Sequence, residues 1–474
     1  MKKIVLPLAL LAMIISCKDK DSKKENGQNN KDQLSIITLD PGHFHAALVQ
    51  KEMYPGVDSN VYVYAPAGED LDLHLKRIEA FNTRATDPTH WKENVYTGTD
   101  FFQKMIRDEK ARPNGSTGPG SLVVMSGNNQ KKAEYVLNTV DAGMNVLADK
   151  PMAIDQSGFE LIKNAFTKAA EKKVLLYDIM TERFEINSVL QRELSQIKQV
   201  FGTLEKGTPE NPAVTKESVH FLYKSVSGAV LQRPAWFFDV TQQGEGIADV
   251  STHLVDLAQI ECFPDQALDY QKDVELVSAK HWTTPLTLSQ FTEITKQPAF
   301  PDYLKKNVTK DTILNTYFNG SFQYKLRGIN IKITATWDYK APAGSGDTYY
   351  SALRGTRASL TIRQGAAENY KPTLYIEPVK NNDTGFEKDL AAAIATLQAK
   401  YPGVSIKKTA KGWQAVVPEK YNTGHEAHFG QVMEHYLRFL KEKKLPDWEV
   451  PNMITKYYTT TSALELAKQS ATKK

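Results

Sequence analysis

The chain has 474 residues, of which 41% are hydrophobic and 24% are charged, and its formal net charge is +4. This length predicts two domains, each large enough to bury its own core. The weak net charge argues against a nucleic-acid partner. No apolar run reaches the roughly 18 residues that a membrane-spanning helix needs.

The first 17 residues are typical of an export signal. Two lysines precede a short apolar run over 4–15, and Ser16-Cys17 follows it. An aliphatic-x-small-Cys ending resembles the lipobox of bacterial lipoproteins, in which the cysteine becomes the lipidated first residue. The polar stretch 18–33 then predicts a flexible tether. We expect an exported protein with a lipid anchor at Cys17, on the periplasmic or outer-membrane face; a plain signal peptide is the alternative.

Only two cysteines occur, Cys17 and Cys262. If Cys17 is lipidated, Cys262 has no partner for an intramolecular disulfide. A multi-cysteine zinc site is therefore excluded, and Cys262 is expected to be a core residue.

Strands and helices alternate from residue 34 to residue 178. Apolar runs that predict strands lie at 35–39, 61–64, 122–125, 146–148 and 174–177. Continuous apolar runs separated by amphipathic stretches are typical of parallel strands with helices on both faces. We therefore expect an α/β fold whose first domain, 34–178, is a doubly wound, Rossmann-type parallel sheet.

The pattern changes over 179–474. Residues 329–337 alternate between apolar and polar, and similar patterns lie at 313–326, 349–363 and 373–376. Long helices are expected at about 387–400 and 428–441. The second domain is thus predicted to be α+β with an open, mostly antiparallel sheet. Such sheets often pair face to face, which favours a homo-oligomer.

The turn after the first strand stands where a dinucleotide-binding fold has its glycine-rich loop. Only Gly42 occupies a glycine position, while Asp40 and His45 stand at the other two. An acidic residue is unfavourable beside phosphate, and no clear ribose-binding acid follows. The choice between NAD and NADP therefore stays open.

Histidines near both ends of the chain invite a metal interpretation. His43 and His45 form a pair, but no third ligand lies near them in the sequence, so we expect no metal there. The group His425, His428 and His435 lacks the spacing of a zinc-binding helix motif.

Two further stretches carry chemistry. Asp149-Lys150-Pro151 ends a predicted strand, at the edge where open α/β sheets bind ligands. Asp249, His253 and Asp256 are spaced to share one face of a helix. Gly246 would let the backbone approach a ligand there. Carboxylates and an imidazole together can hold sugar hydroxyls and move a proton.

Taken together, these stretches resemble the Gfo/Idh/MocA oxidoreductases. Asp149-Lys150-Pro151 corresponds to the family's Glu-Lys-Pro, and Gly246 to Asp256 matches its Gly-x-x-Asp-x-Gly-x-His-x-x-Asp motif. Ser126-Gly127-Asn128-Asn129 and Arg183-Phe184 also match. The resemblance covers roughly 34–363, with Asp149 in place of Glu and Ser251 in place of Gly.

The resemblance implies hydride transfer between NAD or NADP, held tightly, and a small sugar, glycoside or polyol. Lys150 and His253 would be the acid/base pair in an order left open, and Asp249 would orient the substrate. The cofactor would contact Asp40, Gly42, His43, His45, Ser126, Asn128, Asn129, Asp149 and Lys150. The substrate would contact Arg183, Trp236, Asp249, His253 and Asp256. The ring of Trp236 either stacks on a sugar or packs in the core.

Two alternatives remain. One is a glycoside hydrolase that oxidises a ring carbon, eliminates and reduces again, as one branch of similar proteins does. The other is a carbohydrate-binding lipoprotein that kept the fold and lost the nucleotide loop.

Overall fold

The computed structural model describes residues 33–111, 120–226, 229–380 and 383–472, so Cys17 lies outside the described residues. Within these ranges, every helix is too short or too polar to cross a membrane.

The first sheet is the expected parallel one. Its six strands run in the order β3-β2-β1-β4-β5-β6, with every neighbouring pair parallel. The strands are β1 Leu34–Leu39, β2 Val57–Ala65, β3 Lys92–Thr97, β4 Ser121–Met125, β5 Asn145–Asp149 and β6 Leu176–Ile179. The helices are α1 His45–Leu48, α2 Glu69–Thr83, α3 Phe101–Ala111, α4 Lys132–Asp141 and α5 Gln156–Lys172. The Rossmann-type prediction is confirmed.

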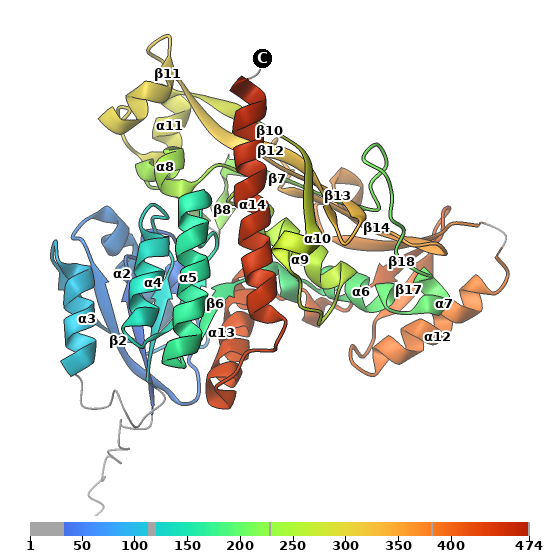
Figure 1. Cartoon of the computed structure of the whole chain (residues 1–474), viewed down its shortest axis with the longest axis horizontal. Coiled ribbons are helices and arrows are strands. Elements are labelled where there is room, and N and C mark those ends of the chain that lie inside the picture. The colour runs from blue at the N-terminus through green and yellow to red at the C-terminus, as the bar shows by residue number, and fades with distance from the viewer. Residues whose placement is uncertain (1–32, 112–119, 227–228, 381–382, 473–474) are drawn as a thin grey trace, which may run out of the picture.

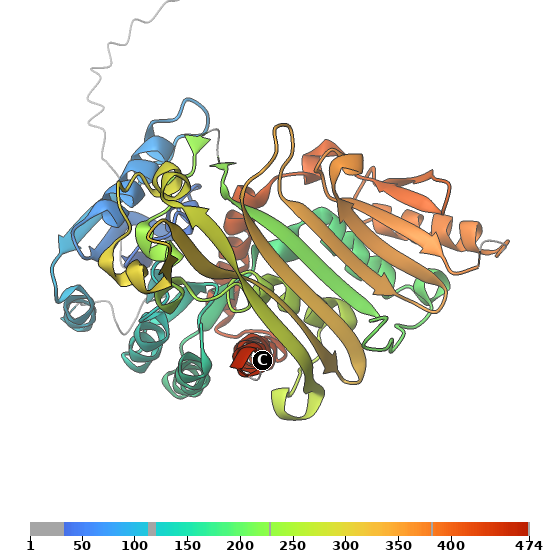
Figure 2. The same cartoon turned by 90° about the horizontal axis from the view of Figure 1, so that it is seen from above.

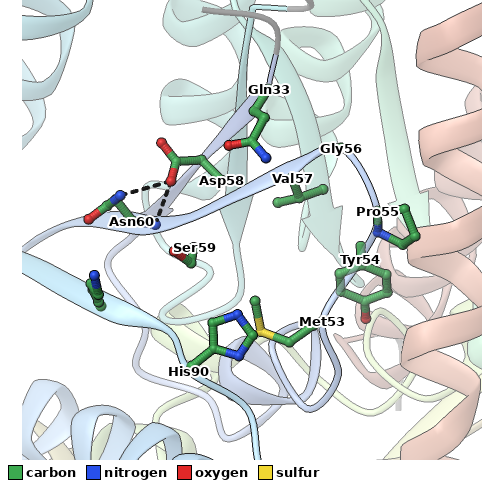
Figure 3. A pocket seen from close by; sticks show the side chains of 11 residues that line it. Gln33, Met53, Tyr54, Pro55, Gly56, Val57, Asp58, Ser59, Asn60 and His90 are labelled. Carbon is green, nitrogen blue, oxygen red and sulfur yellow. Dashed lines mark hydrogen bonds between the residues drawn. The ribbon is translucent and has the colours of Figure 1, made fainter. Parts of the chain in front are cut away.

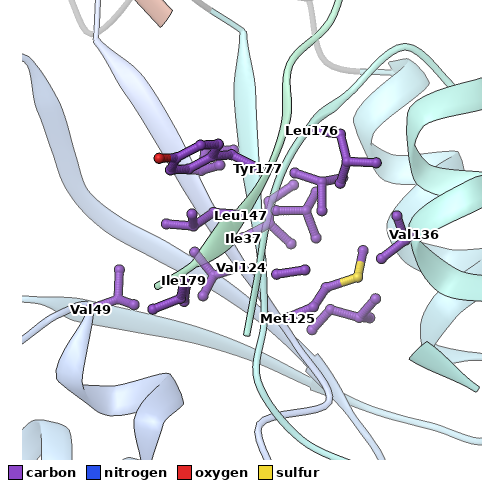
Figure 4. Close-up of a cluster of buried hydrophobic side chains, with 14 of the residues drawn as sticks. Ile37, Val49, Val124, Met125, Val136, Leu147, Leu176, Tyr177 and Ile179 are labelled. Carbon is purple, nitrogen blue, oxygen red and sulfur yellow. The ribbon is translucent and has the colours of Figure 1, made fainter. Parts of the chain in front are cut away.

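The core of this sheet explains why its central strands β1, β4 and β5 are largely apolar. Ile37, Val124 and Leu147 come from adjacent strands and are almost completely buried (Figure 4). Helix α13, His425–Glu442, belongs to the same core. The hydroxyl of its Tyr436 donates to the carbonyl oxygens of Val146 and Leu175, at 3.0 and 2.7 Å. The first core is therefore completed by chain from beyond the predicted boundary at 178.

The second sheet has ten strands and is mostly antiparallel (Figure 2). Its order is β10-β12-β13-β7-β14-β15-β16-β18-β17, with β11 paired to β12. The strands are β7 Val214–Tyr223, β10 Val274–Thr287, β11 Val308–Thr309, β12 Ile313–Leu326, β13 Ile329–Lys340, β14 Thr348–Arg354, β15 Ala358–Gln364, β16 Thr373–Pro378, β17 Ser405–Lys408 and β18 Trp413–Val416. The pair β7 and β13 is parallel, which makes the sheet mixed. Residues 349–363 form a hairpin that turns after Arg354.

Helices cover one face of this sheet and join it to the first domain. They are α6 Ile186–Ser195, α7 Lys198–Phe201, α8 Val240–Gln243, α9 Ser251–Cys262, α10 Tyr270–Asp273, α11 Leu288–Thr295, α12 Phe386–Gln398 and α14 Glu449–Thr472; the short 3-10 helices η2 Thr181–Phe184 and η3 Ala235–Phe238 matter for the site. Helix α14 runs between the two sheets, beside α5 and α9 (Figure 1). The side chain of Cys262, at the end of α9, packs against the second core and is half-buried.

A buried ion network fixes the junction. The guanidinium of Arg183 bonds both oxygens of Asp256 at 2.7 Å and contacts Glu449 at 2.8 and 3.0 Å. The ammonium of Lys456 lies 2.7 Å from Asp178 and 2.8 Å from Asp256. Because buried charges need partners, the network holds β6, η2, α9 and α14 in one arrangement.

Candidate functional site

A cavity of about 1430 Å³ lies at the carboxyl ends of β1 and β5, facing the second sheet. The lining residues from the first domain include His43, His45, Asp149 and Lys150. The second domain contributes residues that include Asp249, His253, Glu182, His220, Arg233 and Asp347. The two stretches Asp149-Lys150 and Asp249–His253 therefore meet in one cavity, as the sequence predicts.

Lys150 and Asp249 form the closest link between the two stretches. The ammonium Nζ of Lys150 lies 2.6 Å from Oδ1 of Asp249, and both side chains are about nine-tenths buried. The other oxygen of Asp249 accepts from the amide of Gln243 at 3.2 Å. Lys150 follows the end of β5, and Asp249 lies in the turn before α9. The pair therefore bridges the domains inside the cavity.

His253 lies one helical turn beyond Asp249 and also lines the cavity. Burial and the nearby positive charges of Lys150 and His425 hold the pKa of His253 well below its usual value. Its Nδ1 is buried and has no hydrogen-bond partner among the described residues. A neutral imidazole beside an ion pair can accept a proton from a bound hydroxyl.

Asp149 points at the histidines of the first turn. Its Oδ2 lies 2.9 Å from Nδ1 of His45 and 3.8 Å from Nδ1 of His43, and accepts from the hydroxyl of Ser126 at 2.8 Å. Burial is the main cause that lowers the pKa of both imidazoles. Asp149 therefore lies beside the two histidines in the structure and supplies the third possible ligand that the neighbouring sequence does not contain.

Three further residues line the cavity without having been predicted as site residues. His425 and His428 of α13, which the sequence showed only as part of a histidine group, are two of them, and the rings of His425 and His45 have centroids 5.4 Å apart. Lys132 is buried, donates to the carbonyl oxygen of Asp149 at 3.1 Å, and burial lowers its pKa to about 8. Lys132 lies in a run of polar residues and could not be distinguished from its neighbours in the sequence. For His425 and His428, the clustering of histidines was the only feature in the sequence that pointed to a site.

The turn that would carry the pyrophosphate is closely packed. A Cβ on Gly127 would lie 1.9 Å from the carbonyl oxygen of Asp40, so only glycine fits there. A Cβ on Gly42 would lie 2.9 Å from a carboxylate oxygen of Asp70 and 3.1 Å from the ring of Trp236. The indole Nε1 of Trp236 donates to that same carboxylate at 2.7 Å.

Two further features of this turn disfavour phosphate. Helix α1 has only four residues, so it offers little of the helix dipole that attracts an anion. Burial and the charge of Asp70 raise the pKa of Asp40 to about 6. Two carboxyl groups therefore stand beside Gly42, the one glycine position that the sequence retains.

The loop after β4 is occupied by contacts with the second domain. The side-chain amide of Asn128 donates to that of Gln242 at 2.7 Å, and the amide of Asn129 donates to the carbonyl oxygen of Gln243, also at 2.7 Å. Asn129 lines the cavity, whereas Asp40, Gly42, Ser126 and Asn128 lie outside its lining.

The structure places three predicted substrate residues away from the cavity. Arg183 and Asp256 bind each other within the buried ion network, and Trp236 packs against Gly42. On α9, His253 and Asp256 therefore face different surroundings, in contrast to the expected shared face. Gly246 also differs: a Cβ there would lie 1.8 Å from the carbonyl oxygen of Phe318, so its backbone approaches β12 and not a ligand.

A second hollow of about 610 Å³ lies at the opposite, amino-terminal edge of the first sheet (Figure 3). Its lining includes Met53, Tyr54 and His90, and Asp58 accepts from the backbone and side chain of Asn60 at 3.0 and 2.8 Å. Its lining carries Asp58 and Lys92 as charged residues, whereas the large cavity gathers an ion pair and several histidines, so we assign the site to the large cavity.

The family match covers the second domain. Residues 190–468 match the family described as "Putative oxidoreductase C terminal domain". No curated protein sequence is similar to the chain at a significant level.

Solved structures extend the match to the whole described fold. A crystal structure of a putative oxidoreductase from Parabacteroides merdae ATCC 43184 is 54% identical, with a TM-score of 0.88, covering 92% of this chain and 98% of that one. A levoglucosan dehydrogenase in complex with NADH and levoglucosan is 12% identical, with a TM-score of 0.56 and coverages of 92% and 98%. A 3-ketoreductase from Actinomadura kijaniata, in complex with TDP-benzene and NADP, is 13% identical, with a TM-score of 0.53 and the same coverages. The chain belongs to the oxidoreductase family defined by this C-terminal domain, and it shares its two-domain fold with these solved structures.

Proposed function

We propose that this protein is an NAD(P)-dependent oxidoreductase that acts on a hydroxyl of a sugar, glycoside or polyol. The observation that carries the proposal is the Lys150–Asp249 ion pair, 2.6 Å long, beside His253 in the cavity between the domains. The family assignment supports an oxidoreductase. The sugar dehydrogenase and the ketoreductase of similar fold, which bind NADH and NADP, support the cofactor and the substrate class.

The cavity residues suit proton transfer on a hydroxyl. A hydroxyl bound between Lys150 and His253 can give its proton to the neutral imidazole, while the ammonium of Lys150 stabilises the developing negative charge on oxygen. Asp249 holds the ammonium in place. When bound, the nicotinamide would accept the hydride.

The residues fit the two ends of a dinucleotide unequally. Asn129 and Lys150 border the cavity and can hold the nicotinamide end. Around Gly42 the fit is poor, because Trp236 and the carboxylate of Asp70 pack against this turn and leave little room for a pyrophosphate. Binding of the whole cofactor therefore needs these two side chains to move.

That packing favours one alternative, a carbohydrate-binding protein without cofactor. Mass spectrometry of the denatured, purified protein distinguishes the two. The proposal expects NAD(H) or NADP(H) at close to one per chain. A fully folded protein that carries no nucleotide and binds none when it is added would favour the alternative. A glycoside that releases its aglycone would instead indicate the redox and elimination reaction of a hydrolase.

We also propose that the protein is exported and anchored by a lipid on Cys17. The support is the sequence alone: the apolar run before Ser16-Cys17 and the polar stretch after it. Metabolic labelling with a radioactive fatty acid should mark the wild type and not a Cys17→Ser variant. Equal labelling of both would contradict the anchor.

A further inference from the structure

His43, His45 and Asp149 form a compact group that the proposed acid/base chemistry does not use. One candidate ligand atom from each lies within 4.8 Å of the other two. The histidines come from the turn after β1, and Asp149 is the last residue of β5. The fold therefore gathers two imidazoles and one carboxylate at the sheet edge that faces the cavity.

We infer that His43, His45 and Asp149 bind a divalent transition-metal ion of the zinc type. Zinc takes imidazole and carboxylate ligands at about 2.0–2.2 Å, which places tetrahedral ligands about 3.4 Å apart. The carboxylate oxygen is 2.9 Å from one Nδ1 and 3.8 Å from the other, so both distances lie close to that value. The three ligand atoms all lie within 4.8 Å of one another, so rotation of the side chains would bring them to this spacing.

The chemistry of the ligand set agrees with this assignment. Two histidines and one carboxylate, with further positions open, is the donor set of catalytic zinc and of non-haem iron sites. The hydroxyl of Ser126 donates to Oδ2 of Asp149 at 2.8 Å, the kind of contact that orients a ligating carboxylate. All three ligands line the cavity, so the open positions can take an oxygen of a bound substrate.

Two lysines close to Asp149 bind groups other than its carboxylate. The ammonium of Lys150 is paired with Asp249 at 2.6 Å, so the carboxylate of Asp149 is not its partner. Lys132 donates to the main-chain carbonyl of Asp149 and not to its carboxylate. In the absence of an ion, Nδ1 of His45 bonds to Asp149 and Nδ1 of His43 accepts from the backbone N–H of His45 at 3.3 Å, contacts that a bound ion would replace.

The inference is independent of the proposed function, because ion binding can be measured without cofactor or substrate. The full chain would be stripped with a chelator and titrated with Zn²⁺ by calorimetry. We expect one ion per chain. His45→Gln and Asp149→Asn should each lower the affinity for Zn²⁺ at least 100-fold, because loss of a residue that only supports a ligand already costs about 10- to 100-fold. His220→Gln is the matched control, because His220 lies in the same cavity beside Asp347, at 3.3 Å, and should bind as the wild type does.

Two results would overturn the inference: a folded wild type that binds no Zn²⁺, or binding that His45→Gln and Asp149→Asn leave intact. If these variants do not fold, X-ray absorption of the Zn²⁺-loaded wild type would identify the ligands of the ion. Two imidazoles and oxygen ligands support the site, whereas a shell without imidazole refutes it. Neither result depends on whether NAD(P) binds.

Discussion

Lys150 and Asp249 stand 99 positions apart in the chain, yet their charged groups lie 2.6 Å apart in the cavity between the domains. If this pair holds the reacting hydroxyl, Lys150→Met should lower turnover about 10²- to 10⁴-fold with sugar or polyol substrate, the usual range for loss of a general acid/base group. Steady-state kinetics would measure it. Lys325→Met is the matched control, because Lys325 forms an exposed ion pair with Glu275 at 2.8 Å. A Lys150 variant with wild-type turnover would refute the role.

His253 is predicted to set the acid side of the pH profile. Its pKa is lowered mainly by burial, so the imidazole stays neutral and able to accept a proton well below pH 6.5. The rate of oxidation should therefore fall only at acidic pH in the wild type, and His253→Gln should lose that step along with most of its turnover. An unchanged pH profile in the variant would place the essential base elsewhere.

The fold could be predicted from the sequence further than the site could. Continuous apolar strands were sufficient to predict the parallel sheet. The motifs around Lys150 and His253 were sufficient to predict that these two stretches meet. Helix α14 was missed because many of its buried positions carry polar side chains, mostly threonine. Its one buried lysine, Lys456, forms ion pairs with Asp178 and Asp256. The pairing of His43 and His45 with Asp149 joins the turn after β1 to the end of β5, and no local spacing reveals it.

Asp256 is predicted to stabilise the fold and not to bind substrate. Burial alone would raise its pKa, but Arg183 and Lys456 lower the pKa well below its usual value. Asp256→Asn leaves their charges short of a partner, so we expect a loss of about 3–5 kcal/mol in the free energy of unfolding at neutral pH. Denaturant unfolding would measure this loss, and a change below about 1 kcal/mol would contradict the network's role.

The stability difference between the wild type and Asp256→Asn is also predicted to depend on pH. An aspartate whose folded pKa is lowered contributes stability above its unfolded pKa of about 3.9, and the contribution is lost as pH falls toward the folded pKa. The difference between wild type and Asp256→Asn should thus be constant above about pH 5 and shrink below about pH 4. A difference that grows on acidification would contradict the assigned shift.

Asp70 is predicted to oppose the cofactor's phosphates. Its carboxylate stands beside Gly42, and a nearby like charge costs about 1–4 kcal/mol, so Asp70→Asn should raise NAD(P) affinity about tenfold or more. Asparagine keeps an acceptor for the indole of Trp236. Asp72→Asn, on the exposed side of the same helix, should leave affinity unchanged. Equal affinities in all three proteins would show that the nucleotide does not approach Gly42.

The central claim is that hydride chemistry takes place beside Lys150. The most direct measurement mixes purified wild type and Lys150→Met, both loaded with oxidised nucleotide, with candidate sugars and polyols in a single turnover, and follows the absorbance of reduced nicotinamide. We predict that the wild type forms reduced nicotinamide with at least one of these substrates and that the variant forms it far more slowly. Equal rates in two folded, nucleotide-loaded proteins would contradict the account.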